Sequence, residues 1–392
     1  MRHFGHISPA AREGLFHREP AEFTAGSPAR ILAAALGATL YSPAVRPQLA
    51  SDIRKQAARG VVSMVLCLED SISDAEVTAG EENLVRQFAE LDAQAREDGA
   101  AELPLLFVRV RTPEQIPDLV ARLGASVRWL AGFVLPKFTE ERGIAFLDAV
   151  AAAEAASGQR LYAMPVLESP ELLHLETRVE ALAGISRTVN RHRDRVLALR
   201  LGVTDFCSAY GLRRSPDMTA YDVQIVANVI ADVVNVLSRA DGTGFTVTGP
   251  VWEYFRHQER MFKPQLRRSP FLDGQAEDLR TTLIEHDLDG LLREIELDRA
   301  NGLLGKTCIH PAHTTPVHAL SVVSLEEFSD AQDILRPERG GGGVMRSAYT
   351  NKMNEVKPHR AWAERTMLRA EVFGVAKEDV GFVDLLTAGL QV

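Results

Sequence analysis

Carboxylates that follow short apolar runs are the residues of this sequence whose types and spacing could do chemistry. Glu69 and Asp70 follow one such run, Glu168 follows another, and Asp205 comes just after the next run along the chain. Carboxylates brought together in a folded protein are costly to bury unless a cation or a proton is shared among them. We therefore assign Glu168 and Asp205, which come from neighbouring runs, to a divalent cation.

The expected cation is Mg²⁺, with Mn²⁺ as the alternative. An all-oxygen site completed by water favours these ions over Zn²⁺, which prefers His and Cys. A role as a helix cap or an ion-pair partner is the alternative for each carboxylate. In the tetrad His310-Pro-Ala-His313 the proline indicates a turn, so we expect His310 to cap a loop rather than bind zinc.

Basic residues at the ends of the same runs could bind an anionic substrate. Arg109 and Lys137 lie at the ends of two runs, Arg46 follows the first run, and Arg213 comes shortly after Asp205. Guanidinium and ammonium groups bind carboxylates and phosphates well. We expect Arg46, Lys137 and Arg213 to contact substrate. An ion pair between strands, or a plain surface patch for Arg213, is the alternative.

Eight apolar or β-rich runs must position these residues. They alternate with amphipathic, Ala- and Leu-rich stretches, a pattern typical of a parallel sheet wound with helices. Eight such units predict an α/β fold, a (β/α)8 TIM barrel, in which residues just after the strands face one mouth. The predicted strands are Ala38–Ser42, Val61–Leu68, Pro104–Val110, Gly132–Pro136, Leu161–Leu167, Val196–Gly202, Gly244–Pro250 and Leu304–Ile309.

The chain divides into three predicted parts. Residues 1–37 form an N-terminal extension, residues 38–320 the TIM-barrel catalytic domain, and residues 321–392 a C-terminal helical segment. The four glycines at 340–343 indicate a hinge before that segment, and the basic stretch at 260–270 could add to an anion site. The 392 residues exceed the roughly 250 of a typical barrel, which leaves room for both additions.

Composition narrows the partners. The 44 Lys and Arg against 53 Asp and Glu give a net charge of −9, which argues against non-specific nucleic-acid binding. The sequence has no apolar run long enough to span a membrane and no signal peptide, so we expect a cytoplasmic protein without membrane contact. The three dispersed cysteines are expected to be buried and structural: Cys67, Cys207 and Cys308.

Seven short strings stand in order, about one per predicted strand. They are LYSPAVRPQL at 40–49, VLCLEDSISDAE at 65–76, VRV at 108–110, GFVLPKFTE at 132–140, PVLES at 165–169, LGVTDF at 201–206 and GKTCIHPAH at 305–313. In this order the chain resembles the HpcH/HpaI aldolase and citrate lyase β-subunit superfamily, whose first motif is LFVPGxRP. The resemblance runs from about Ala38 to His318.

The resemblance implies roles for single residues. Glu168 and Asp205 would bind Mg²⁺, Arg109 would contact the oxygen of a keto acid or thioester, and Glu69 and Asp70 would support metal-bound water or substrate. It also implies a homo-oligomer, a trimer or a hexamer.

A C-terminal string, NKMNEVKPHRAWAER at 351–365, resembles a family segment whose acidic residue serves as catalytic acid or base, sometimes from a neighbouring subunit. Glu355 is the equivalent here. A solvated Glu at the start of a helix is the alternative.

The residues after Glu168 depart from the family pattern. Ser-Pro-Glu-Leu stands where acyl-CoA-using members have Thr-Ala-Arg-Gly, which removes a glycine and a positive charge. The substrate is therefore expected to differ from citryl-CoA or malyl-CoA. With its long extension, the chain is similar to the branch of TIM-barrel C–C bond lyases linked to tellurite-resistance and stress clusters.

We predict an Mg²⁺-dependent carbon–carbon lyase or aldolase that acts on a small 2-oxo acid or hydroxy-acyl derivative. The substrate would chelate the metal, and the cation with Arg109 would stabilise the enolate formed when the bond breaks. Two alternatives stay open. One is a malate-synthase-like or thioester-hydrolysing enzyme with Glu355 as base, and the other is a non-catalytic barrel that serves as a scaffold or ligand sensor.

Overall fold

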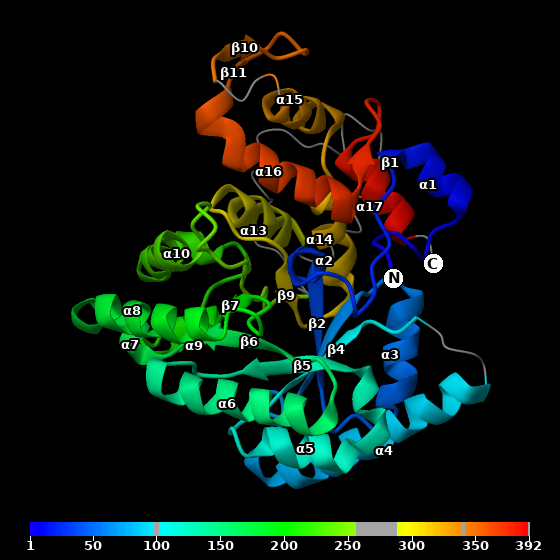
Figure 1. The fold of residues 1–392 in the computed structure, drawn as a ribbon, viewed down its shortest axis with the longest axis vertical. Coiled ribbons are helices and arrows are strands. Elements are labelled where there is room, and N and C mark those ends of the chain that lie inside the picture. The colour runs from blue at the N-terminus through cyan, green and yellow to red at the C-terminus, as the bar shows by residue number, and fades with distance from the viewer. Residues whose placement is uncertain (98–101, 256–287, 337, 339–341, 391–392) are drawn as a thin grey trace.

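Eight parallel strands form the centre of the molecule (Figure 1). Their order in the sheet is β8-β7-β6-β5-β4-β3-β2-β9, and a parallel bridge from Gly249, directly after β8, to Lys306 of β9 joins the two ends. The sheet therefore closes into a barrel, and the predicted (β/α)8 fold is confirmed. The strands are β2 (Ala38–Pro43), β3 (Ser63–Cys67), β4 (Leu105–Arg109), β5 (Leu130–Leu135), β6 (Tyr162–Leu167), β7 (Leu199–Leu201), β8 (Val247–Thr248) and β9 (Lys306–Cys308).

The structure is a computed structural model that describes residues 1–97, 102–255, 288–336, 338 and 342–390. The basic stretch at 260–270 and part of the glycine run at 340–343 lie outside the described residues.

Helices between the strands coat the barrel (Figure 1). Helix α6 shows how the ends of a helix are capped locally. The Thr139 side chain accepts from the Arg142 N–H at its start, and Gly158 ends it in the left-handed region. The helices are α3 (Leu49–Ala58), α4 (Val77–Glu97), α5 (Gln115–Leu123), α6 (Glu140–Ser157), α7 (Pro170–Leu173), α8 (Leu175–Arg191), α9 (Val203–Ser208), α10 (Gln224–Leu237), α13 (Leu288–Ala300) and α14 (Thr314–Ser321).

Both faces of the strands are buried, which is why they stand out as apolar runs. Successive side chains point to opposite faces of a strand. Leu66 and Val108 belong to the large apolar cluster shared with the helices, whereas Val65 and Phe107 belong to a second cluster that fills the barrel.

The end of the barrel at which the strands begin is closed by α2 (Ala29–Ala35). Leu32 of α2 and Phe373 of the C-terminal segment share the apolar cluster that contains Phe107. The Ser63 hydroxyl, at the start of β3, donates to the Leu36 carbonyl over 2.7 Å. The opposite end, where the strands finish, is therefore the end available for a site.

The N-terminal extension packs on the C-terminal segment (Figure 1). Strand β1 pairs antiparallel with β12, and helix α1 contacts α17. In the same region α16 packs on α15 and on α2. The two chain ends therefore build one lobe beside the barrel. Its elements are α1 (Pro9–Leu15), β1 (Phe16–Arg18), α15 (Leu325–Leu335), β10 (Val344–Arg346), β11 (Met353–Glu355), α16 (Val356–Phe373), β12 (Val375–Ala376) and α17 (Phe382–Leu390).

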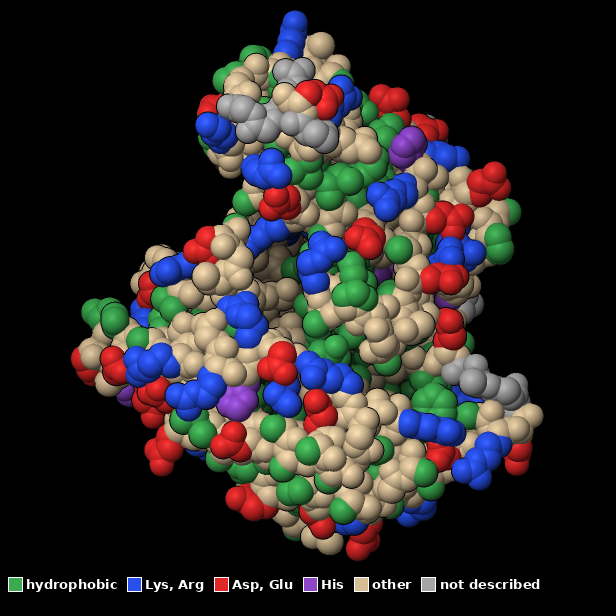
Figure 2. All heavy atoms as spheres, viewed as in Figure 1, with side chains coloured by type: hydrophobic (Ala, Val, Ile, Leu, Met, Phe, Trp, Pro, Cys, Tyr) green, Lys and Arg blue, Asp and Glu red, His purple; other side chains and the backbone are tan. Residues whose placement is uncertain are grey.

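Three further features concern the chain as a whole. Among the described helices, none is both long enough and apolar enough to cross a membrane. Figure 2 shows Lys and Arg side chains interspersed with Asp and Glu on the viewed face, rather than gathered by sign. The predicted burial of the cysteines is confirmed, and their thiols are free: Cys67, Cys207 and Cys308.

Candidate active site

Six of the predicted site residues lie at the carboxyl ends of consecutive strands. Because β3 to β7 are adjacent in the sheet, their side chains share one sector of the barrel mouth. Glu69 and Asp70 follow β3, Arg109 ends β4, Lys137 follows β5, Glu168 follows β6, and Asp205 lies in the first turn of α9 after β7.

Arg109 joins the carboxylates of this sector. Its Nη2 lies 2.7 Å from Glu69 Oε2, 3.2 Å from Asp70 Oδ2 and 2.9 Å from Glu168 Oε1. Burial works against its charge, but the surrounding negative charges, that of Glu168 first and that of Glu69 among the others, together outweigh burial and raise the pKa of the guanidinium above its ordinary value. Arg109 is therefore a permanent cation in contact with three carboxylates.

Arg111 positions the loop that carries Glu69 and Asp70. Its Nε donates to the Leu68 carbonyl over 2.7 Å, and its Nη2 donates to the carbonyls of Glu69 and Ile72. A guanidinium has five N–H donors in a rigid fork, which suits it to holding several carbonyls at once. The loop after β3 is thus held from β4.

Lys137 contacts the cluster through both its backbone and its side chain. Its N–H donates to Glu168 Oε1 over 2.8 Å, and its Nζ lies 2.6 Å from Glu69 Oε1. The residue has a φ of 49°, in the left-handed region, which costs a non-glycine residue on the order of 1 kcal/mol. Such strain often marks functional sites, and here it aims the N–H at Glu168.

Glu168 and Asp205 are the electrostatic centre of the site. Glu168 is 4% exposed, and burial, aided by the nearby Asp205 charge and opposed by Arg109, raises its pKa to about 7. Burial and the charge of Asp70 raise the pKa of Asp205, whose side chain hydrogen-bonds to Glu168. Two carboxyl groups in contact cannot both be ionised without a shared proton or cation.

The pKa values of Glu69 and Asp70 are shifted in opposite directions. Burial raises the pKa of Glu69. Burial acts in the same direction on Asp70, but its hydrogen bond with Glu69 and the charges of Arg109 and Lys137 outweigh it and lower the Asp70 pKa. Asp70 is the more exposed of the two, so it is the ionised carboxylate closest to solvent.

The pair Glu168 and Asp205 fits a hard divalent cation. A bound cation would take the place of the proton that the two carboxyls must otherwise share. Within the described residues, no group of three or more His, Cys, Asp or Glu side chains is placed to hold a metal. Mg²⁺ is the ion that proteins commonly bind through one or two carboxylates, with water and substrate completing the shell.

Comparison with known families decides the class of the protein. Residues 30–375 match the model of a family described as C–C bond lyases of the TIM-barrel fold. The chain belongs to this family. The match confirms the predicted carbon–carbon lyase class and the predicted branch, and it favours an enzyme over a non-catalytic scaffold. No curated protein sequence matches the chain.

Solved structures share the fold of this lyase. The protein CitE from Mycobacterium tuberculosis, in complex with magnesium, acetoacetate and coenzyme A, has a TM-score of 0.51 and 19% identity over 86% of this chain and 99% of its own. A citrate lyase from Burkholderia xenovorans has a TM-score of 0.59 and 18% identity over 91% and 96%. The magnesium/glyoxylate complex of Haloferax volcanii malate synthase has a TM-score of 0.50 and 14% identity over 71% of this chain and 73% of its own.

Among the described residues, neither Arg46 nor Arg213, both predicted to bind substrate, forms an ion pair or a hydrogen bond with the cluster. Arg46, in the loop after β2, is half-exposed, and its Nε lies 2.6 Å from Asp52 Oδ2 of α3. Arg213 is exposed on the loop after α9. Its neighbour Arg214 is buried and lies 2.7 Å from Glu294 of α13, so it holds that loop in place. Substrate contact by Arg46 and Arg213 stays a prediction.

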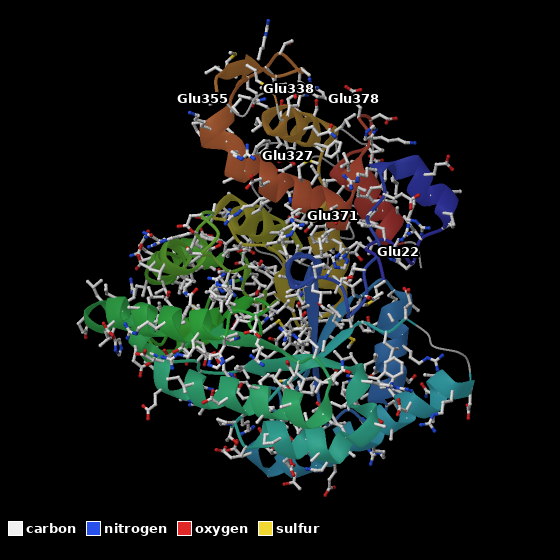
Figure 3. The ribbon with its side chains drawn as sticks, in the orientation of Figure 1. Glu22, Glu327, Glu338, Glu355, Glu371 and Glu378 are labelled. Carbon is white, nitrogen blue, oxygen red and sulfur yellow. The ribbon has the colours of Figure 1, made fainter. Side chains whose placement is uncertain are left out.

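Glu355 lies in the C-terminal lobe. It is exposed at the end of β11, and its backbone N–H donates to Nδ1 of His359, in the first turns of α16, over 3.1 Å. Figure 3 places it at the end of α16 farthest from the barrel ribbon. The described residues thus show a helix-start Glu. A role as catalytic acid or base, and the trimer or hexamer that could bring it to another subunit's site, stay predictions.

Gly202 is a site residue that sequence reasoning missed. A Cβ added there would lie 2.3 Å from Glu168 Cβ and 2.4 Å from Glu168 Oε2. Any larger residue at position 202, directly after β7, would therefore collide with Glu168. The sequence carries an indication of this role in LGVTDF, where Gly202 ends the apolar run and stands three residues before Asp205.

Proposed function

We propose that this lyase binds Mg²⁺ through Glu168 and Asp205 and cleaves a small 2-oxo acid or hydroxy-acyl derivative by way of an enolate. The observation that carries the proposal is the contact between these two carboxyls beside Arg109. When bound, Mg²⁺ supplies a Lewis acid for the substrate's carbonyl and carboxylate oxygens. The magnesium complexes of CitE and malate synthase, which share the fold, support this choice of ion.

Arg109 provides the protein's own positive charge for the reaction. Its side chain is 11% exposed, and a buried guanidinium acts more strongly on a developing negative charge than one in water would. It favours the ionised form of Glu168 that a cation requires, and it balances negative charge on the substrate. Glu69, in contact with Arg109 and Lys137, keeps both cations in place.

Lys137 is the residue we assign to an anionic group of the substrate. Its side chain is 41% exposed, whereas those of Arg109 and Glu168 are almost fully buried. Its ammonium lies 3.7 Å from Asp70 Oδ1, so it stands between the buried cluster and solvent. Asp70, ionised and half-exposed, is placed to orient water or a substrate hydroxyl.

Substitution of the two carboxylates tests this function. Enolate formation can be followed without knowing the physiological substrate, through the exchange of pyruvate methyl protons with D2O by NMR. Glu168→Gln and Asp205→Asn should each lower this exchange by about a hundredfold or more and abolish Mg²⁺ binding in calorimetry, because each removes a charged ligand. The thermal midpoint and circular dichroism should stay close to those of the wild type.

Glu140→Gln is the matched control. Glu140 also pairs with an arginine, Arg187 at 2.8 Å, but on the exposed surface of α6. This variant should bind Mg²⁺ and exchange pyruvate protons as the wild type does. Wild-type exchange in either Glu168→Gln or Asp205→Asn would contradict the proposal, as would Mg²⁺ binding that neither substitution changes.

A further inference from the structure

The hydroxyl of Tyr41 is a polar group at the barrel mouth that the mechanism above leaves unused. Tyr41 lies on β2 opposite Val65 of β3, two residues after Thr39. Thr39 accepts a hydrogen bond from Ser63 inside the barrel, so Tyr41 shares this inward face. Its side chain packs against the apolar cluster that fills the barrel.

Tyr41 reaches the mouth of the barrel. It is partly exposed, whereas Leu40 and Ser42 on either side of it are buried. Because α2 closes the other end of the barrel, an inward side chain on β2 gains its exposure at the mouth. Among the described residues, the Tyr41 hydroxyl forms no hydrogen bond. It is thus a donor without a partner beside the candidate site.

Charged groups of the site surround the phenol. The Arg200 guanidinium carbon lies 5.4 Å from the centre of the Tyr41 ring. Arg109 and Glu168 are close enough to act on the phenol electrostatically. Burial, opposed by the charges of Arg200 and Arg109, raises the phenol pKa above its ordinary value, so the hydroxyl keeps its proton at neutral pH.

Arg200 supports the ring from inside the barrel. It is 1% exposed, and its Nη2 donates to Thr307 Oγ1 over 2.7 Å, across the interior from β7 to β9. Its Nη1 lies 3.4 Å from Thr39 Oγ1, and within the described residues Arg200 has no carboxylate partner. A buried cation without a counter-ion is costly. The positive charge of Arg200 also makes the space around Tyr41 favourable for an anionic ligand.

We propose that the Tyr41 hydroxyl contacts the substrate and donates a hydrogen bond to the oxygen on which negative charge develops, with Arg200 as the residue that positions the ring. The inference rests on the proposed function. A hydrogen bond to an oxygen strengthens as that oxygen becomes anionic, so it stabilises the reacting state more than the bound substrate. The motif that LYSPAVRPQL resembles has Phe at this place, so the hydroxyl distinguishes this chain.

Tyr41→Phe removes the hydroxyl and keeps the ring. With Mg²⁺ bound, the maximal rate of pyruvate methyl-proton exchange should fall about tenfold or more, the range expected for a hydrogen bond to a charged group. The KM for pyruvate should change by less than about twofold, because the bond acts mainly on the reacting state. Oxalate, which resembles the enolate of pyruvate, should inhibit the exchange by Tyr41→Phe about tenfold more weakly than it inhibits exchange by the wild type.

Tyr162→Phe is the matched control for this substitution. Tyr162 is also a barrel tyrosine beneath an arginine, with Arg160 5.2 Å from its ring, but at the start of β6, away from the mouth. This variant should exchange pyruvate protons and bind oxalate as the wild type does. Mg²⁺ affinity and the thermal midpoint should be unchanged in both Phe variants.

Arg200→Met tests the positioning role. It should lower the exchange rate in the wild-type background but add little to the loss in Tyr41→Phe, because two residues acting through one contact are not additive. Full exchange and full oxalate inhibition in Tyr41→Phe would overturn the inference while leaving the proposed function intact. A Tyr41→Phe variant that loses Mg²⁺ affinity or thermal stability along with exchange would also overturn it. If the wild type neither binds Mg²⁺ nor exchanges protons, the proposed function itself fails.

Discussion

The charge state of Glu168 depends on whether a cation is present. Burial raises its pKa to about 7, Arg109 opposes this rise, and the charge of Asp205 adds to it. The folded-state pKa is above the ordinary value of 4.5, so without metal this group contributes stability that is fully present below about pH 4.5 and is lost as pH rises through about 7. A bound cation must therefore displace a proton from Glu168 below neutral pH.

Mg²⁺ affinity should consequently fall as the solution becomes more acidic. Between pH 8 and pH 6 we expect the Kd for Mg²⁺ to rise about tenfold, because Glu168 is mostly ionised at the first pH and mostly protonated at the second. Calorimetry in two buffers with different ionisation enthalpies should show close to one proton released per Mg²⁺ at pH 6 and almost none at pH 8. Equal affinity at the two pH values would show that Glu168 is not a ligand.

Much of the site was predictable at the level of single residues, but its interior supports were not. Glu168 and Asp205 could be found because a carboxylate after an apolar run is easy to see and the fold brings strand ends together. Arg200 sits in the middle of a run, and its contact with Thr39 spans 161 residues of sequence. Nothing local indicates that an arginine inside a strand crosses a barrel, so such contacts required the structure.

Strand β9 and helix α13 are joined by buried charges. Lys306 of β9 is 1% exposed and its Nζ lies 2.8 Å from Glu294 Oε1 and 2.7 Å from Asp298 Oδ2, both on α13. Burial raises the pKa of Asp298 to about 6, against the opposing charge of Lys306. Because the bridge between Gly249 and β9 is at Lys306 itself, these ion pairs act where the barrel closes.

Removing this lysine should weaken the whole barrel. Lys306→Met removes the cation from the buried Asp298 and leaves Glu294 with Arg214 alone, which should lower the free energy of unfolding in urea by about 3 to 5 kcal/mol at pH 8. Arg187→Met is the control, because Arg187 also pairs with two glutamates but on the surface, and it should change stability little. The deficit of Lys306→Met should shrink at pH 5, where Asp298, whose pKa burial raises to about 6, can take up a proton. An equal deficit at both pH values would contradict the account.

At the scale of the whole molecule, the two chain ends are tied together around buried histidines. His3 of the extension is fully buried, its ring centre lies 4.5 Å from that of His318 in α14, and it stacks on Phe373 of α16 at 4.3 Å. Its Nε2 lies 3.1 Å from the Ala35 carbonyl at the end of α2. Burial lowers the pKa of His3 to about 3 and that of His318 well below its ordinary value. The neutral imidazoles of His3 and His318 thus join the N-terminal extension to α14 and α16.

Acid should therefore loosen this lobe before the rest of the fold. A histidine with a depressed pKa contributes stability that is present above its ordinary pKa of 6.5 and is lost as pH falls toward its folded value, here about 3 for His3. Between pH 6.5 and pH 5 the contribution of His3 alone should lower the free energy of unfolding by nearly 2 kcal/mol, on the order of one pKa unit's worth of free energy per pH unit. His3→Phe keeps the stack on Phe373 and cannot be protonated, so its urea stability should fall less over this range than that of the wild type. The control is His17→Phe, at an exposed position of β1, whose free energy of unfolding should fall with pH as much as that of the wild type. If the free energy of unfolding of His3→Phe fell as much as that of the wild type, the neutral imidazole of His3 would not hold the chain ends together.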